Sequence, residues 1–328
     1  MNKASIKGIG AHVPETKIPN SYFNELLGED VDSWLQENVN IHNRYWCKSD
    51  ESVADLCEAA GRKALVDAGI DPVDIDLLII STDTPEYVSP STASVVQDRL
   101  GLLNAGTFDL NTACAGFVTA MDVASKYIAA DSRYEHILVI GGYAMSKYLN
   151  KEDKKTVTLF ADGAGAVVLS ADNSGPGFIT SDLRTQGEYN SWMGIYGGAT
   201  HMPVSEEVIA NHDHQLKFVH KFPKELNPIT WTEMALDICG RLGMKPDDFD
   251  HYFITQLNFH AINETMDNLG VNRDKAHMIM DKYGYTGSAC IPMALEDAYA
   301  KNKLKKGDKI MFIGSGGGLA FAAAAFEY

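Results

Sequence analysis

Two kinds of hydrophobic pattern recur along the chain, and each predicts a different element. Asp76 to Ser81 (DLLIIS) is an almost continuous apolar run, which is typical of a buried strand in a sheet covered on both faces. Residues 52–68 instead carry apolar side chains every three to four positions, which predicts an amphipathic helix. By the same criteria we expect further strands at 3–10, 107–110, 136–140 and within 160–170, and further helices at 19–29, 30–38, 91–100 and directly after Cys114.

The second half of the chain repeats the pattern of the first at an offset of 174 positions. The repeat is clearest around LVDAGIDPVDIDLLIIS, where the matched residues are Gly69 with Gly243, Pro72 with Pro246, Asp76 with Asp250 and Ser81 with Thr255. One supersecondary unit used twice predicts an α/β fold with two similar sheets. We therefore divide the chain into an N-terminal half (1–172), a glycine-rich connector (173–226) and a C-terminal half (227–328).

Cys114 lies in a turn of small residues, between the strand predicted at 107–110 and the helix that follows. Unpaired backbone N–H groups and the positive end of the helix dipole favour a thiolate there, which is the nucleophilic form of cysteine. A small cysteine packed in a core turn is the alternative interpretation. The repeat favours a nucleophile, because a site between two duplicated halves draws loops from both, and only Ser288 stands at the equivalent place of the second half.

Charge and cysteine usage exclude several classes of protein. The chain has 28 basic and 44 acidic side chains, and its net charge of −16 argues against nucleic acid or an anionic membrane as a partner. No apolar run approaches ~18 residues, so we expect no membrane span, and the N-terminus lacks the apolar core of a signal peptide. The 5 cysteines are widely spaced without a CxxC pair, which suits a reducing cytoplasm and predicts no metal site.

Five longer motifs indicate a family when they are taken together: NTACAGF around Cys114, FADGAGAVVLS at 160–170, TQLNFHAINETMDNLG at 255–270, YGYTGSACIPMALEDA at 283–298 and the closing GSGGGLAF. Over essentially its whole length the chain resembles the β-ketoacyl-acyl-carrier-protein synthase III group of condensing enzymes. The resemblance implies a thiolase-like fold, in which two duplicated α/β halves carry mixed five-stranded sheets in a layered αβαβα arrangement. It also implies a homodimer in which the loop around Tyr87 to Ser91 closes the acyl pocket of the other subunit.

The resemblance assigns chemistry to particular residues. Cys114 would take an acyl group from an acyl-coenzyme A or acyl-carrier-protein thioester, and the N–H groups of Cys114 and Gly317 would form the oxyanion hole. Trp34 matches a tryptophan that stacks on the adenine of coenzyme A, and Lys154 stands where the family has an arginine on the other side of that base. The thioester is a substrate, and the resemblance implies no bound cofactor.

Two catalytic positions depart from the family pattern. Thr255 occupies the place of the catalytic histidine and Tyr285 that of the catalytic asparagine, which together stabilise the enolate formed when a malonyl thioester loses CO₂. Threonine and tyrosine hydroxyls can donate hydrogen bonds, but neither is a cation or a base near neutral pH. We therefore expect Cys114, Thr255 and Tyr285 to form a rebuilt catalytic site that passes the acyl group to a second substrate by atypical condensation or acyl transfer.

Two alternatives stay open at this point. The first is the standard malonyl-dependent condensation of fatty-acid or polyketide synthesis. The second is a non-catalytic subunit that supports an active paralogue, although such a subunit has no need of a thiol at the position of Cys114.

Overall fold

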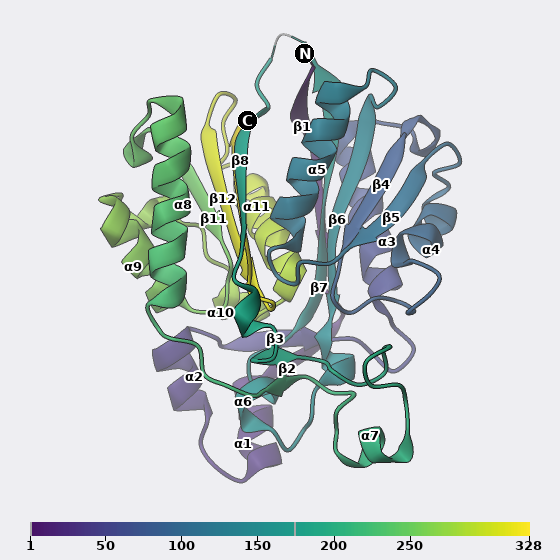
Figure 1. Cartoon of the computed structure of the whole chain (residues 1–328), viewed down its shortest axis with the longest axis vertical. Helices are drawn as coiled ribbons and strands as arrows, with labels where there is room; N and C mark the ends of the chain where they lie inside the picture. Colours follow the sequence, from purple (N-terminus) through teal and green to yellow (C-terminus); the bar gives the residue numbers. More distant parts are fainter. Residues whose placement is uncertain (1, 174) are drawn as a thin grey trace.

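The computed structural model describes residues 2–173 and 175–328, and it is built from two β-sheets alternating with three layers of helices. Figure 1 shows the two sheets side by side, with α5 (Gly116–Ala130) and α11 (Cys290–Ala300) between them. This αβαβα arrangement confirms the predicted fold and the predicted duplication, because α5 and α11 are the equivalent helices of the two halves.

The first sheet has five strands in the order β1-β7-β6-β4-β5. Their bounds are β1 (Lys3–His12), β7 (Asp162–Asp172), β6 (His136–Ala144), β4 (Leu77–Ser81) and β5 (Gly106–Leu110). The three strands β6, β4 and β5 run parallel, whereas β7 is antiparallel to both of its neighbours. The carboxyl ends of the parallel strands therefore meet at one edge of the sheet, and the loops that follow them lie close together.

The second sheet has four strands in the order β11-β12-β13-β8, so the prediction of five strands is wrong for this half. The strands are β11 (His251–Ile254), β12 (Lys309–Gly316), β13 (Ala320–Glu327) and β8 (Phe178–Thr185). Beside β11 there is only a single bridge between Tyr252 and Ala276, followed by the short helix α10 (Met280–Tyr283).

The side chain of Gln256 contacts the segment where a fifth strand was expected. Its Oε1 accepts the Ile279 N–H at 2.9 Å, and its Nε2 donates to the His277 carbonyl at 3.1 Å. Gln256 thus binds backbone groups of residues 277 and 279, while the His277 N–H still donates to the Tyr252 carbonyl at 3.1 Å, and the segment continues into α10.

The outer helices begin and end where the sequence carries capping residues. On the first sheet these are α3 (Val53–Ala68) and α4 (Thr92–Leu100). Ser52 and Asp55 form a capping box before α3, and Ser91 caps α4 through the Ser94 N–H. On the second sheet the equivalent helices are α8 (Leu226–Leu242) and α9 (Phe259–Leu269).

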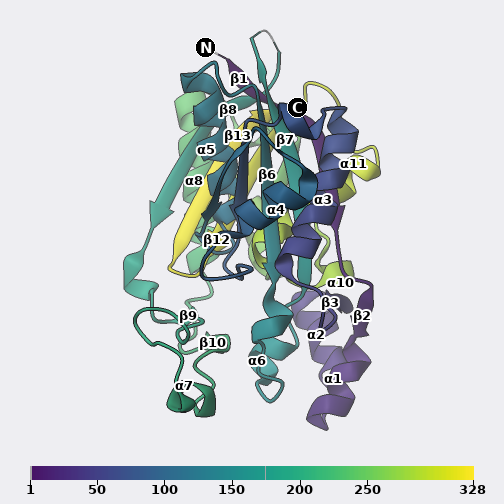
Figure 2. The same cartoon turned by 90° about the vertical axis from the view of Figure 1, so that its right-hand side faces the viewer.

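A smaller region lies beyond the carboxyl end of β6, at the bottom of Figures 1 and 2. Its elements are α1 (Asn20–Leu27), α2 (Asp32–Val39), α6 (Lys154–Val157), α7 (Glu206–Ala210), the pair β2 (Thr16–Pro19) and β3 (Asn43–Trp46), and the pair β9 (Met193–Gly194) and β10 (Lys217–Phe218). Within the described residues, no helix has both the length and the apolar character needed to cross a membrane.

The segment predicted as a connector, 173–226, contributes more than a link. Its first part is β8, which pairs along β13 from Phe178 to Thr185 and forms the outer strand of the second sheet. The side chains of β8 are only partly covered, so its sequence shows only a weak alternation of apolar and polar residues. This is why no strand was expected there.

Candidate active site

Cys114 lies in a tight turn that joins the end of β5 to the start of α5. The turn is closed by two backbone hydrogen bonds, from Ala115 N to Thr112 O at 3.2 Å and from Gly116 N to Ala113 O at 2.9 Å. Ala113 has φ = 46°, a left-handed conformation that is uncommon for a residue with a side chain. The chain therefore accepts local strain to present the Cys114 side chain at the carboxyl edge of the first sheet, toward the second half.

The Cys114 thiol is buried, with 3% of the residue exposed. Burial raises the pKa of this thiol, the charge of Asp83 raises it further, and a hydrogen bond with the Tyr285 hydroxyl opposes both. Desolvation therefore opposes the effect of the helix terminus on this thiol. The thiol must lose its proton when it reacts, and a proton acceptor is part of the chemical problem of this site.

Tyr285 reaches Cys114 from the second half of the chain. Its backbone is held in a strand-like bridge beside Phe160, with hydrogen bonds from Ala161 N to Tyr285 O at 2.9 Å and from Tyr285 N to Leu159 O at 3.0 Å. Its side chain is 2% exposed, and its hydroxyl forms a hydrogen bond with the Cys114 side chain. Burial raises the pKa of Tyr285 well above its usual value, so the phenol stays protonated and donates to the sulfur.

Thr255 follows the last residue of β11 and is also buried. Its Oγ1 accepts the Ser315 N–H at 2.9 Å and lies 3.4 Å from the Ser315 carbonyl oxygen. The hydroxyl of Thr255 is thus bound to the backbone of β12 at Ser315, the residue before Gly316. The structure brings Tyr285 to Cys114 and binds Thr255 to the residue that precedes Gly316.

The glycine loop after β12 packs directly on the Cys114 turn. A side chain at Gly316 would collide with the Cys114 backbone nitrogen and would come within 2.8 Å of Thr112 O, so only glycine fits. Gly317, the predicted oxyanion donor, is the next residue, and its open side faces Met193 of β9. The loop therefore lies between the Cys114 turn and Met193 of β9.

The residues predicted to bind coenzyme A lie in the smaller region at the bottom of Figure 1. Trp34 is on α2 and is 52% exposed, as a side chain that stacks on a ligand must be before binding. Lys154 begins α6, and its Nζ lies 2.9 Å from Glu29 Oε2, in the segment between α1 and α2. This ion pair brings α6 next to the helix that carries Trp34.

One partly buried acid at this edge was not expected from the sequence. Asp83 follows β4 by two residues, and burial raises its pKa to about 6. The signal was present, because a carboxylate directly after a buried parallel strand lies at the edge where sites of α/β proteins are built. Among the described residues, no group of three or more histidine, cysteine, aspartate or glutamate side chains is arranged to hold a metal ion.

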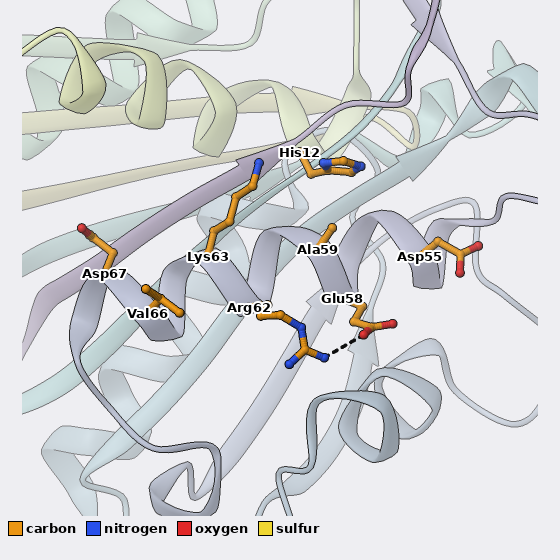
Figure 3. Close-up of a pocket in the computed structure, with 8 residues that line it drawn as sticks. All are labelled: His12, Asp55, Glu58, Ala59, Arg62, Lys63, Val66 and Asp67. Carbon is orange, nitrogen blue, oxygen red and sulfur yellow. Dashed lines mark hydrogen bonds and ion pairs between the residues drawn. The ribbon is translucent and has the colours of Figure 1, made fainter.

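A separate surface groove of about 700 Å³ runs along the exposed side of α3. Figure 3 shows its lining, in which Arg62 and Glu58 pair across one helical turn and His12 and Lys63 stand on the other side. The residues of the Cys114 site do not line this groove.

The comparisons with known proteins agree with this geometry. The family model for 3-oxoacyl-[acyl-carrier-protein (ACP)] synthase III matches residues 108–187, and the model for the C-terminal part of that family matches residues 239–328. The β-ketoacyl-[acyl-carrier-protein] synthase III of Desulfitobacterium hafniense (strain Y51) is 35% identical over 332 residues, which covers 100% of this chain and 98% of that protein. The corresponding protein of Clostridioides difficile (strain 630) is 32% identical over 326 residues, with coverage of 99% and 98%.

Solved structures give the same result. The crystal structure of 3-oxoacyl-(acyl carrier protein) synthase III from Pseudomonas aeruginosa PAO1 superposes with a TM-score of 0.90 at 26% identity, covering 99% of this chain and 98% of that chain. Fold and site together define a condensing enzyme of the thiolase-like class, an acyltransferase. The chain belongs to the 3-oxoacyl-[acyl-carrier-protein] synthase III family.

Proposed function

We propose that this protein takes an acyl group from a coenzyme A or carrier-protein thioester onto Cys114 and holds it there as a new thioester. The observation that carries the proposal is the convergence on one thiol of three segments: the strained turn itself, the Tyr285 hydroxyl from the second half, and the glycine loop packed on the Cys114 nitrogen. In the attack, the N–H groups of Cys114 and Gly317 would hold the developing oxyanion.

For the second half-reaction we propose carbon–carbon bond formation with a malonyl thioester, as in a standard 3-oxoacyl-acyl-carrier-protein synthase III. The names of the relatives support this alternative better than the atypical transfer expected first from the sequence. Thr255 and Tyr285 favour a second candidate, transfer to an atypical acceptor. The hydroxyl of Thr255 is bound to Ser315, and neither side chain supplies the histidine or the asparagine of the family pattern.

The proposal extends to binding partners and location. Trp34 and Lys154 would hold the adenine of coenzyme A at the exposed side of α2 and α6. The acyl carrier protein is the partner that the family's name implies, and we propose a homodimer in the cytoplasm. No bound cofactor is required for these steps, because the thioester itself is the activated group.

The test is the intact mass of the protein after incubation with a panel of acyl-coenzyme A species. We expect an increase equal to one acyl group in the wild-type protein and none in Cys114→Ala. Cys239→Ala is the matched control, because Cys239 is buried in α8 of the other half and should leave the adduct unchanged. No adduct with any donor would contradict the proposal and favour the non-catalytic subunit.

Malonyl-coenzyme A then separates the two candidates for the second step. Added to the acylated enzyme, it should release CO₂ and give a 3-oxoacyl product if condensation is standard. Acylated enzyme that persists, with neither CO₂ nor ketoacyl product, would exclude the standard reaction and leave the atypical acceptor.

A further inference from the structure

The loop after β4 holds Asp83 at the carboxyl edge of the first sheet, next to the turn of Cys114. The Thr82 N–H donates to the carbonyl of Leu110, the last residue of the neighbouring strand β5, at 3.1 Å. Two residues further on, the Thr84 Oγ1 accepts the Ala144 N–H of β6 at 2.9 Å. Asp83 is thus fixed between its two threonine neighbours, one bound to β5 and the other to β6, and Cys114 follows β5 by four residues.

The carboxyl group of Asp83 is unlike the structural carboxylates around it. Its Oδ1 is buried and has no hydrogen-bond partner among the residues that the structure describes. In contrast, buried Asp162 accepts the N–H groups of Cys47 at 2.7 Å and of Ser146 at 2.8 Å. Asp109 accepts two N–H groups at the start of α4. A buried carboxyl oxygen left without a partner costs stability, and such groups cluster at functional sites.

The charge of Asp83 acts on groups of three different segments. It raises the pKa of Cys114, and it also raises that of Tyr143 on β6 and of Tyr148 beyond it. The other titratable groups around the thiol are Tyr143, Tyr285 and Cys290, which are neutral near pH 7. Asp83 is therefore the one carboxylate among the groups that act on the thiol in the described part of the chain.

Among the described residues, the hydrogen bonds of the site give the Cys114 thiol a donor. They give it no acceptor for its own proton. Tyr285 donates to the sulfur, and the Thr255 hydroxyl is bound to Ser315. Attack on a thioester needs the opposite function, a group that removes the thiol proton.

We propose that Asp83 is the general base of the acylation step, a catalytic residue that neither the family pattern nor the sequence motifs assign. As the Cys114 sulfur bonds to the acyl carbon, its proton passes to the Asp83 carboxylate. As the bond from the acyl carbon to the leaving sulfur breaks, the same proton passes on to that sulfur and gives the free thiol. The protein ends with an acylated Cys114 and an ionised Asp83, so protons and charge balance.

This inference rests on the proposed acyl-enzyme, and its test gives two readouts that move in opposite directions. In Asp83→Asn we expect acylation by acyl-coenzyme A, followed as intact mass in single turnovers, to slow by at least ~10²-fold, the usual contribution of a general base. Alkylation of Cys114 by iodoacetamide should become faster at pH 7–8, because removing the negative charge lowers the pKa of the thiol. A variant that merely disturbs folding would slow both reactions or expose other cysteines.

The pH profile gives a third readout. Wild-type acylation should rise as pH increases through about 6, where Asp83 loses its proton, and Asp83→Asn should lack this limb. Formate should restore part of the acylation rate in Asp83→Gly. Asp71→Asn is the matched control, because Asp71 is exposed before β4, at the opposite edge of the sheet, and this variant should behave as wild type.

The outcomes distinguish this inference from the proposed function. Wild-type protein that never forms an adduct overturns both. Wild-type protein that acylates normally overturns the inference alone if Asp83→Asn keeps its rate and its limb near pH 6. The inference is also overturned if Asp83→Asn slows acylation while Cys114 alkylation slows as well and formate restores nothing.

Discussion

Thr255 shows how a buried side chain can join the ends of two neighbouring strands. Its hydroxyl accepts the Ser315 N–H at 2.9 Å inside the protein, where no water replaces it. The two residues end neighbouring strands, so the bond joins the end of β11 to the end of β12. We infer that Thr255 acts as a positioning residue, which holds the glycine loop in place against the Cys114 turn.

Replacing Thr255 with valine should therefore lower the free energy of unfolding by more than the change in side-chain volume explains. The Ser315 N–H would stay buried without an acceptor, at a cost of roughly 1–3 kcal/mol in the free energy of unfolding. Urea denaturation measures this difference. Thr255→Ser keeps the oxygen and should lose less.

Thr265→Val is the matched control for this prediction. Thr265 is fully buried on α9, and its hydroxyl donates to the Ala261 carbonyl at 2.8 Å, four residues earlier in the same helix. Removing that bond orphans no backbone N–H, so we expect a loss below about 1 kcal/mol. Equal stability of Thr255→Val and wild type would refute the positioning role.

At the scale of elements, the site depends on how closely β12 approaches the turn before α5. The two belong to different halves of the chain, and Gly316 is the point of contact. A side chain there would meet Cys114 N, Thr112 O and the Ala113 side chain together. Since these atoms belong to a strained, hydrogen-bonded turn, they cannot move aside without changing the direction of the thiol.

Gly316→Ala should consequently impair acylation more than it impairs folding. Overpacking of this kind costs roughly 1–3 kcal/mol in stability. Displacing an oxyanion-hole donor slows reaction by about 10²-fold or more. Intact-mass kinetics and urea denaturation measure the two effects on the same sample.

Gly240→Ala serves as the control for that substitution. Gly240 lies on α8 with nothing within 4 Å of the added methyl group, so the change should be neutral or stabilise by up to about 1 kcal/mol. If Gly316→Ala acylated as fast as Gly240→Ala, the close approach of β12 would not matter for the reaction.

Elements with a strong local signal were predictable from the sequence, and elements decided by distant contacts were not. The apolar run of β4 and the capping box at Ser52 indicate their own bounds. At the place of a fifth strand in the second sheet, Gln256 binds backbone groups of residues 277 and 279, and no local pattern records that contact. The state of the Cys114 thiol depends on burial and on Asp83, which the sequence separates from it by thirty-one positions.

At the scale of the whole molecule, the first sheet ends in an open edge. β5 is hydrogen-bonded to β4 on one side only, so its other side presents unpaired backbone groups. The strand beside β5 is β4. The loop after β4 carries two exposed hydrophobic side chains, Tyr87 at 53% and Val88 at 87%. An open strand edge beside exposed apolar residues is what association with a second copy of the chain would cover.

We expect the protein in solution to have twice the mass of one chain, measured by light scattering on a sizing column. Val88→Asp should weaken the dimer by at least about tenfold in its dissociation constant, because a carboxylate would be buried without a partner. Val66→Asp is the control, since Val66 is 77% exposed on α3, which packs mainly on β1 and β7 at the opposite end of the sheet. A monomeric wild-type protein would contradict the dimer, and equal dissociation constants for both variants would place the interface away from the loop after β4.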